Sequence, residues 1–252
     1  MTTTVFLHGW GATSATWGTV AQFFRAQGDC LFIDFDCAPT AVLTLDDYAD
    51  FAEKQILEFL TSGGDSPFKE RGGTRSVMTH EVRHMAEPSL ARRDAIQGYV
   101  PSINIIGHSF GARVAVLLAT RHPNLINRLV LTGAAGLRPR RSLRRWARIK
   151  IYKWFKIGRG SADYRRLTPA GKRTFQNIIH RDLAPEIARI TAPTLLLWGK
   201  RDKSTPLYMG KRWTKLLQRA ILKVYPRAGH FAFLDAPARF IHDAYQFLDG
   251  GL

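Results

Sequence analysis

The stretch Asn104-Ile105-Ile106-Gly107-His108-Ser109-Phe110-Gly111-Ala112-Arg113 decides the fold of this chain. It predicts a buried strand over residues 103–106, a sharp G-x-S-x-G turn, and a helix from about Ala112 to Arg121. The two glycines let the end of the strand and the start of the helix approach closely, and the turn exposes Ser109 above the sheet edge. A serine hydroxyl is a weak nucleophile at neutral pH, so Ser109 needs a base and a partner that orients the base.

Two later turns offer those partners. A strand over residues 194–198 runs into Gly199-Lys200-Arg201-Asp202, and a strand over residues 221–225 runs into Gly229-His230-Phe231. Ligand sites in α/β sheets lie past the carboxyl ends of the strands, so we interpret His230 as the base and Asp202 as its acid. Asp34 and Asp36 close an earlier strand, over residues 30–35, and are alternative acids that precede Ser109 in the chain.

The first strand, residues 4–7, ends in His8-Gly9-Trp10-Gly11. Such a glycine-flanked turn can aim a backbone N–H at a developing oxyanion, so we expect the N–H groups of Trp10 and Phe110 to form an oxyanion hole. We interpret His8 as a structural residue that holds this turn.

Taken together, the H-G-W-G, G-H-S-F-G, W-G-x-x-D and G-H-F motifs resemble those of esterase-like members of the α/β-hydrolase family. The resemblance covers residues 4–60 and 100–250, and a serine nucleophile separates this chain from the dehalogenase and epoxide-hydrolase branches. It implies an α/β fold of about six parallel strands with helices on both faces, plus a helical cap. The second strand would form one edge, followed by the first, third, fourth, fifth and sixth. The turn after residue 34 departs from the family pattern, which leaves the shape of that rim open.

The resemblance implies a reaction without a cofactor: cleavage of a carboxylic ester through an acyl-enzyme on Ser109, Asp202 and His230. Trp10, His108 and Phe231 would bind substrate or support the site. The same triad serves thioesterases, lactonases, peptidases and carbon–carbon bond hydrolases, and a non-catalytic ligand receptor is a further alternative.

The chain of 252 residues is long enough for one core domain, predicted over residues 1–136 and 191–252. Residues 62–99, rich in glycine, proline and mixed charges, predict a mobile surface insertion, and residues 137–190 a helical cap. Helices are expected over residues 17–27, capped by Ser14 or Thr16, and over residues 45–60. The two cysteines predict no disulfide framework, and the absence of a long apolar run or signal pattern predicts a cytoplasmic protein.

The net charge of +17 is concentrated in the cap. Between Arg138 and Arg181 there are 15 basic residues and one acidic residue, Asp163, which leaves the core nearly neutral. A solvated basic face is one interpretation. The other is an anionic partner: an acyl chain on an acidic carrier protein, or an anionic membrane contacted through a helix that carries Trp146 and Trp154. Charge alone supports only non-specific binding of nucleic acid, and the sequence predicts no oligomeric state.

One further motif, His80-Glu81-Val82-Arg83-His84, has the H-E-x-x-H pattern of zinc sites. Its flanks lack the apolar helix that such a site packs into, and no third ligand follows at short spacing. We therefore expect no metal, and we interpret the segment as a charged surface helix.

Overall fold

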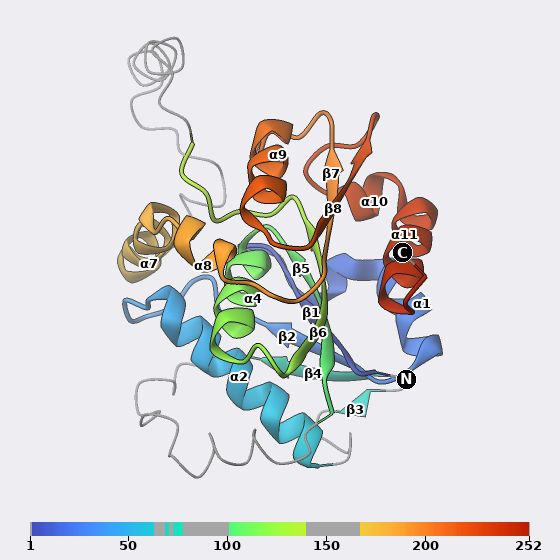
Figure 1. Cartoon of the computed structure of the whole chain (residues 1–252). Coiled ribbons are helices and arrows are strands. Elements are labelled where there is room, and N and C mark those ends of the chain that lie inside the picture. The colour runs from blue at the N-terminus through green and yellow to red at the C-terminus, as the bar shows by residue number, and fades with distance from the viewer. Residues whose placement is uncertain (1, 63–68, 71–72, 78–100, 140–166, 252) are drawn as a thin grey trace.

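The computed structural model describes residues 2–62, 69–70, 73–77, 101–139 and 167–251, which are built around one eight-stranded sheet (Figure 1). The strands are β1 (Thr4–Leu7), β2 (Cys30–Asp34), β3 (Lys69–Glu70), β4 (Gly73–Val77), β5 (Ile103–His108), β6 (Ile126–Thr132), β7 (Thr194–Gly199) and β8 (Ala220–Tyr225). They follow the order β3-β4-β2-β1-β5-β6-β7-β8, and all pairs are parallel except β3 with β4.

The six predicted strands are confirmed, in the predicted order β2-β1-β5-β6-β7-β8. The expectation that the second strand forms an edge is wrong, because β4 pairs with β2 in parallel and β3 then pairs with β4. Part of the segment 62–99 therefore extends the sheet. The stretch Thr74-Arg75-Ser76-Val77 in β4 contains a single apolar residue, so its sequence does not predict a strand. The H-E-x-x-H motif and the Trp146–Trp154 helix lie outside the described residues.

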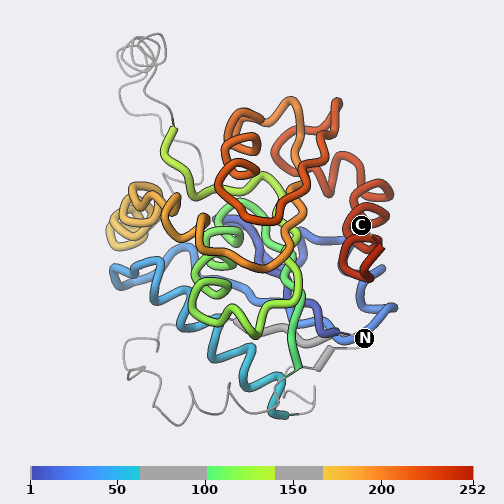
Figure 2. The backbone as a smooth tube through the Cα atoms, in the orientation of Figure 1, coloured from blue at the N-terminus to red at the C-terminus, as the bar shows by residue number. Residues whose placement is uncertain are grey.

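Helices cover both faces of the sheet, as Figures 1 and 2 show. The described ones are the 3₁₀ helix Ser14–Trp17, α1 (Gly18–Gln27), α2 (Leu45–Thr61), α4 (Phe110–Arg121), α7 (Pro169–His180), α8 (Ala184–Ala188), α9 (Leu207–Leu216), α10 (Ala232–Asp235) and α11 (Pro237–Leu248). One buried cluster joins the sheet to α2, α4, α8 and α9, and a second joins its other face to α1, α10 and α11. Within β1, Val5 and Leu7 enter the first cluster and Phe6 the second, as expected of a strand buried on both faces.

The start of α1 differs from the prediction. The helix begins at Gly18 after the 3₁₀ turn, and no side chain caps it. Ser14 instead donates from both its backbone N–H and its hydroxyl to the Asp34 carboxylate at the end of β2. A nearby acceptor in the tertiary structure thus takes up the serine that the sequence pattern assigned to a cap.

The turn between β5 and α4 requires glycine at position 111. A Cβ there would lie 2.2 Å from the carbonyl oxygen of Leu7 at the end of β1, whereas a Cβ at Gly229 would meet nothing closer than 3.5 Å. We expect Gly111→Ala to lower the free energy of unfolding by about 3 kcal/mol, because backbone on both sides of the contact must move. Gly229→Ala is the matched control and should change it by less than about 0.5 kcal/mol. Urea denaturation of both variants measures this, and equal stability would contradict the packing argument.

Among the described residues, none of the helices is long and apolar enough to cross a membrane. Both cysteines are free thiols there, as the sequence predicts, and burial raises the pKa of each to about 12.

Candidate active site

Ser109 occupies the turn between β5 and α4 in a conformation that side chains rarely adopt. Its φ is 51° and its ψ is −104°, and within the described ranges it is the one non-glycine residue with positive φ. Its backbone N–H donates to the carbonyl of Thr132 and its carbonyl accepts from the N–H of Ala135, so the end of β6 and the loop after it hold Ser109 on two sides. Such strain costs about 1–3 kcal/mol and persists only where the surroundings enforce it, which is typical of functional sites.

Asp202, His230 and Ser109 form one hydrogen-bonded chain. The Nε2 atom of His230 lies 3.1 Å from the Ser109 hydroxyl oxygen, and its Nδ1 lies 2.8 Å from Oδ2 of Asp202. These three residues follow the carboxyl ends of β5, β7 and β8, as the sequence predicts. An imidazole between a hydroxyl and a carboxylate can take the hydroxyl proton while the carboxylate stabilises the resulting cation.

Asp202 is buried and fully engaged. Its Oδ1 accepts from the backbone N–H groups of Ser204 and Thr205, and its Oδ2 accepts from the Thr205 hydroxyl as well as from His230. Burial raises the pKa of this carboxyl. The hydrogen bond and the electrostatic attraction of His230, together with the hydrogen bonds from Thr205, outweigh burial and hold the pKa below its usual value. Asp202 is thereby kept ionised and fixed toward His230.

The two alternative acids bind elsewhere. Asp34 accepts from Ser14 and lies 3.6 Å from Nε2 of His8, and Asp36 accepts from the backbone N–H of Ala38. The structure therefore brings Asp202, and neither of these two residues, to His230. His8 is structural, as expected: its Nε2 accepts from the Phe35 N–H, and its Nδ1 lies 2.7 Å from the Gly9 carbonyl.

The two expected oxyanion donors are neighbours. Phe110 is the first residue of α4, where backbone N–H groups have no partner within the helix. Leu7 pairs with Gly107 in the sheet, so the turn that carries Trp10 lies beside the turn that carries Ser109. The Trp10 and Phe110 rings meet edge to face, 5.3 Å apart. These contacts place the turn of Trp10 beside that of Ser109, and the oxyanion hole formed by the N–H groups of Trp10 and Phe110 stays a prediction.

The rings of His108 and Phe231 contact the His230 ring. His108 is 2% exposed, and its Nε2 lies 3.2 Å from the His230 carbonyl oxygen. Burial, followed by the nearby His230, lowers the pKa of His108 to about 3, so its ring is neutral and donates through Nε2. Phe231 is 39% exposed and its ring lies 4.8 Å from that of His108. Phe231 can therefore contact a substrate. His108 is buried and instead holds the backbone of His230 in place through this hydrogen bond.

Two further aromatic side chains pack against the Trp10 ring. The Trp10 ring contacts Tyr48 of α2 at 6.0 Å and Phe175 of α7 at 5.4 Å. Phe175 lies within residues 137–190, the predicted cap, so α7 reaches the turn that carries Trp10. Trp10 and Phe175 are half-buried, whereas Tyr48 is fully buried behind Trp10.

Buried polar groups attach α7 to the core. The guanidinium of Arg113 in α4 is 5% exposed and donates to the carbonyls of Ile178 and Arg181. The Thr174 hydroxyl accepts from the N–H of Leu43, and the Thr168 hydroxyl donates to the Pro39 carbonyl. A polar group buried without a partner is costly, so these bonds fix the position of the helix. No sequence pattern indicates this role for Arg113, which lies inside α4.

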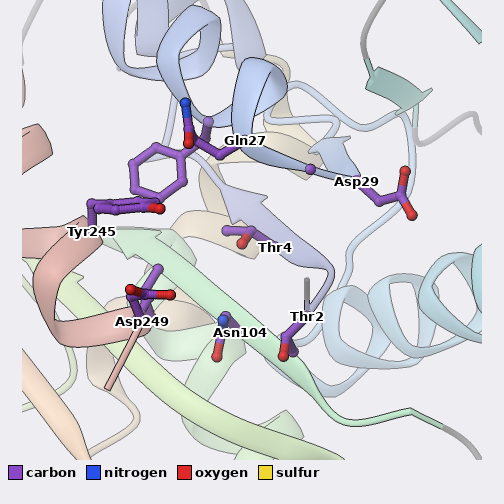
Figure 3. Close-up of a pocket in the computed structure, with 10 residues that line it drawn as sticks. Thr2, Thr4, Gln27, Asp29, Asn104, Tyr245 and Asp249 are labelled. Carbon is purple, nitrogen blue, oxygen red and sulfur yellow. The ribbon is translucent and has the colours of Figure 1, made fainter. Parts of the chain in front are cut away.

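Within the described residues no group of histidine, cysteine or acidic side chains could hold a metal ion. A hollow of about 220 Å³ opens near the amino ends of β1 and β5, between Thr4, Asn104 and Tyr245 (Figure 3). It lies at the opposite end of β5 from Ser109 and has no nucleophile beside a base, so it takes no part in the chemistry below.

Sequence reasoning missed Thr205, whose hydroxyl lies 2.8 Å from Oδ2 of Asp202, 3.0 Å from the Gly133 carbonyl and 3.4 Å from Nδ1 of His230. We expect Thr205→Val to lower turnover about 10-fold, because a hydrogen bond to a charged group contributes about 1.5 kcal/mol. Thr205→Ser keeps the hydroxyl and should retain most of the activity. Ester turnover of the two variants measures this, and equal losses would show that shape alone matters.

The same variant has a pH signature. A carboxyl whose pKa is lowered by folding stabilises the protein above its unfolded pKa, near 4, and that stability is lost as the pH falls through the folded value. Thr205→Val should therefore be less stable than the parent at pH 7, and the difference should shrink below about pH 4. Chemical denaturation at both pH values measures it, and a difference independent of pH would contradict the link to Asp202.

Comparison with known proteins identifies the family of this chain. The model of the "Alpha/beta hydrolase family" matches residues 4–244. A 2-hydroxy-6-oxononadienedioate/2-hydroxy-6-oxononatrienedioate hydrolase of Paraburkholderia xenovorans is 23% identical over 59% of this chain and 63% of its own length. The pimeloyl-[acyl-carrier protein] methyl ester esterase of Nitrosomonas europaea is 24% identical over 55% of this chain and 68% of its own length.

Solved structures share the fold. The esterase EaEST of Exiguobacterium antarcticum superimposes with a TM-score of 0.64 at 16% identity, over 99% of this chain and 92% of its own. The match to the first curated relative spans less than two thirds of that protein, so its activity does not transfer to this chain directly. The family model covers nearly the whole chain, and the order of the strands in the sheet is consistent with the fold of that family. The chain belongs to the alpha/beta hydrolase family.

Proposed function

We propose that this protein is a serine hydrolase that cleaves a carboxylic ester through an acyl-enzyme intermediate. The observation that carries the proposal is the hydrogen-bonded chain from Asp202 through His230 to the strained Ser109. A non-catalytic receptor would have no need for a strained serine in contact with a carboxylate-oriented imidazole.

In the proposed reaction, Nε2 of His230 takes the proton of the Ser109 hydroxyl as its oxygen attacks the ester carbonyl carbon. The N–H groups of Trp10 and Phe110 stabilise the oxyanion, each by about 3 kcal/mol. His230 then gives its proton to the departing alcohol, which leaves the acyl group on Ser109. Water, activated by His230, attacks this ester and regenerates the enzyme, and no step requires a cofactor.

A second candidate reaction is cleavage of a carbon–carbon bond. It is favoured by the relatives that act on 2-hydroxy-6-oxo-dienoates, which are anionic acids according to their names. The ester proposal takes its support from the methyl ester esterase and from EaEST. The names of the first group describe acids, and the basic composition of this chain likewise supports a substrate that carries a negative charge.

Turnover of p-nitrophenyl esters of graded chain length, beside a 2-hydroxy-6-oxo-dienoic acid, separates the two candidates. We expect ester turnover with a chain-length optimum set by the half-buried aromatic side chains of Trp10 and Phe175. Turnover of the dienoic acid with no ester hydrolysis would replace the ester proposal. No turnover of either class would remove the assignment as a hydrolase of these bonds.

A further inference from the structure

Basic residues are also concentrated outside residues 137–190, the predicted cap. Residues 199–219, from the end of β7 through α9 to the residue before β8, contain seven basic residues and one acidic residue, which is the buried Asp202. Six of the basic side chains are exposed: Lys200, Arg201, Lys203, Lys211, Lys215 and Arg219. We call these six residues the α9 surface. The charges of the core domain nearly cancel, but its basic residues are unevenly distributed along the sequence.

Compensating carboxylates lie elsewhere. Five acidic residues fall within α2, and there Arg121 pairs with Asp46 and Asp50 while Arg181 pairs with Asp46. Every ion pair of a lysine or arginine in the described part of the chain uses residues outside the α9 surface. The Arg212 guanidinium donates to the Arg138 carbonyl, and the Arg138 guanidinium donates to the His180 carbonyl. Among the described residues, neither guanidinium pairs with a carboxylate.

This arrangement is unfavourable for the isolated protein. Lys211 and Lys215 are four residues apart on α9, so their like charges repel along one helix face. The loop before α9 also holds the candidate active site in place, because Asp202 and Thr205 lie on it. The α9 surface thus begins in this loop and continues along α9 to Arg219 at the amino end of β8, so an anion bound at its first residues would be held next to the site.

From these observations we propose that the α9 surface docks an acidic protein that carries the substrate acyl group on a tether. This inference rests on the proposed ester hydrolysis. A protein is favoured over a lipid bilayer because the apolar residues of α9, such as Met209 and Trp213, are buried, and no large apolar side chain on α9 is exposed to insert into lipid. A docked acidic protein would satisfy the six cations together and leave its tether free to cross the rim toward Ser109.

The test compares two triple variants with the same change in net charge. Lys211→Gln/Lys215→Gln/Arg219→Gln removes three charges from the α9 surface. Thr19→Glu/Gln22→Glu/Ala26→Glu lowers the charge equally at exposed positions of α1, on the opposite face of the sheet. The probes are an acyl carrier protein loaded with an acyl methyl ester and the same acyl methyl ester without the protein.

We expect the first variant to lose roughly 10-fold or more in kcat/KM on the carrier-bound ester, while the free ester is unaffected and the α1 variant resembles the parent. The parent should lose activity on the carrier-bound ester with added salt, because exposed charges are screened over about 10 Å at 0.1 M. Equal losses in both variants, or no loss in either, would overturn the proposal. So would hydrolysis of the free ester alone by the parent.

Binding separates this inference from the proposed function. Ser109→Ala should bind the carrier protein, and adding the three glutamine substitutions should weaken that binding roughly 10-fold even if no ester is turned over. Phosphatidylglycerol vesicles and a DNA duplex serve as competing anions. If the three substitutions abolish binding to either of these and leave carrier binding unchanged, the α9 surface recognises a different partner and the proposal fails.

Discussion

Ser109→Ala should reduce kcat for ester hydrolysis by roughly 10⁶-fold while the protein stays folded, because no other described nucleophile contacts Nε2 of His230. The backbone of Ser109, at φ 51°, makes a sharper version of the test possible. Glycine adopts positive φ at little cost, whereas alanine keeps the strain of the parent. Ser109→Gly should therefore be as inactive as Ser109→Ala and about 1 kcal/mol more stable.

Turnover and thermal denaturation of the two variants measure both effects. Retention of activity in either folded variant would remove Ser109 from the mechanism. Equal stability would mean that the turn does not strain its central residue.

Asp202→Asn should reduce kcat roughly 10⁴-fold, since an amide cannot stabilise the imidazolium and favours the wrong tautomer of the histidine. The geometry behind this is the 2.8 Å contact between His230 Nδ1 and Asp202 Oδ2. The matched control is Asp34→Asn. Asp34 accepts hydrogen bonds from Ser14 near the start of α1, so its loss should reduce stability and leave turnover of the folded fraction nearly unchanged.

Kinetics of the two variants at equal folded concentration measure this difference. A damaging Asp34→Asn beside a mild Asp202→Asn would reverse the assignment of the acid.

The strands and the turns that hold the candidate site could be predicted from the sequence because their signals are local. Apolar runs such as Ile103–Ile106 and Thr194–Trp198 are buried on both faces, and each ends in a glycine-containing turn that positions one polar residue. The order of Ser109, Asp202 and His230 along the chain then follows from the order of the strands.

The remaining features depend on partners that are distant in the sequence. Thr205 follows a recognisable acid, but only the tertiary structure brings its hydroxyl to the Gly133 carbonyl, 72 residues away. Arg113 donates to carbonyls 65 and 68 residues away. The strand β4 has no apolar alternation of its own and pairs with β2 across an intervening helix. Such long-range contacts leave little trace in local composition.

Covalent labelling by a fluorophosphonate, which reacts with a serine only when a base activates it, tests most directly whether Ser109 is an activated nucleophile. We expect one adduct per chain, on the peptide that contains Ser109, formed rapidly in the parent, slowly in Asp202→Asn and not at all in Ser109→Ala. Equal labelling of the parent and Asp202→Asn, or an adduct on a different serine, would contradict a nucleophile at Ser109 activated through His230 and Asp202.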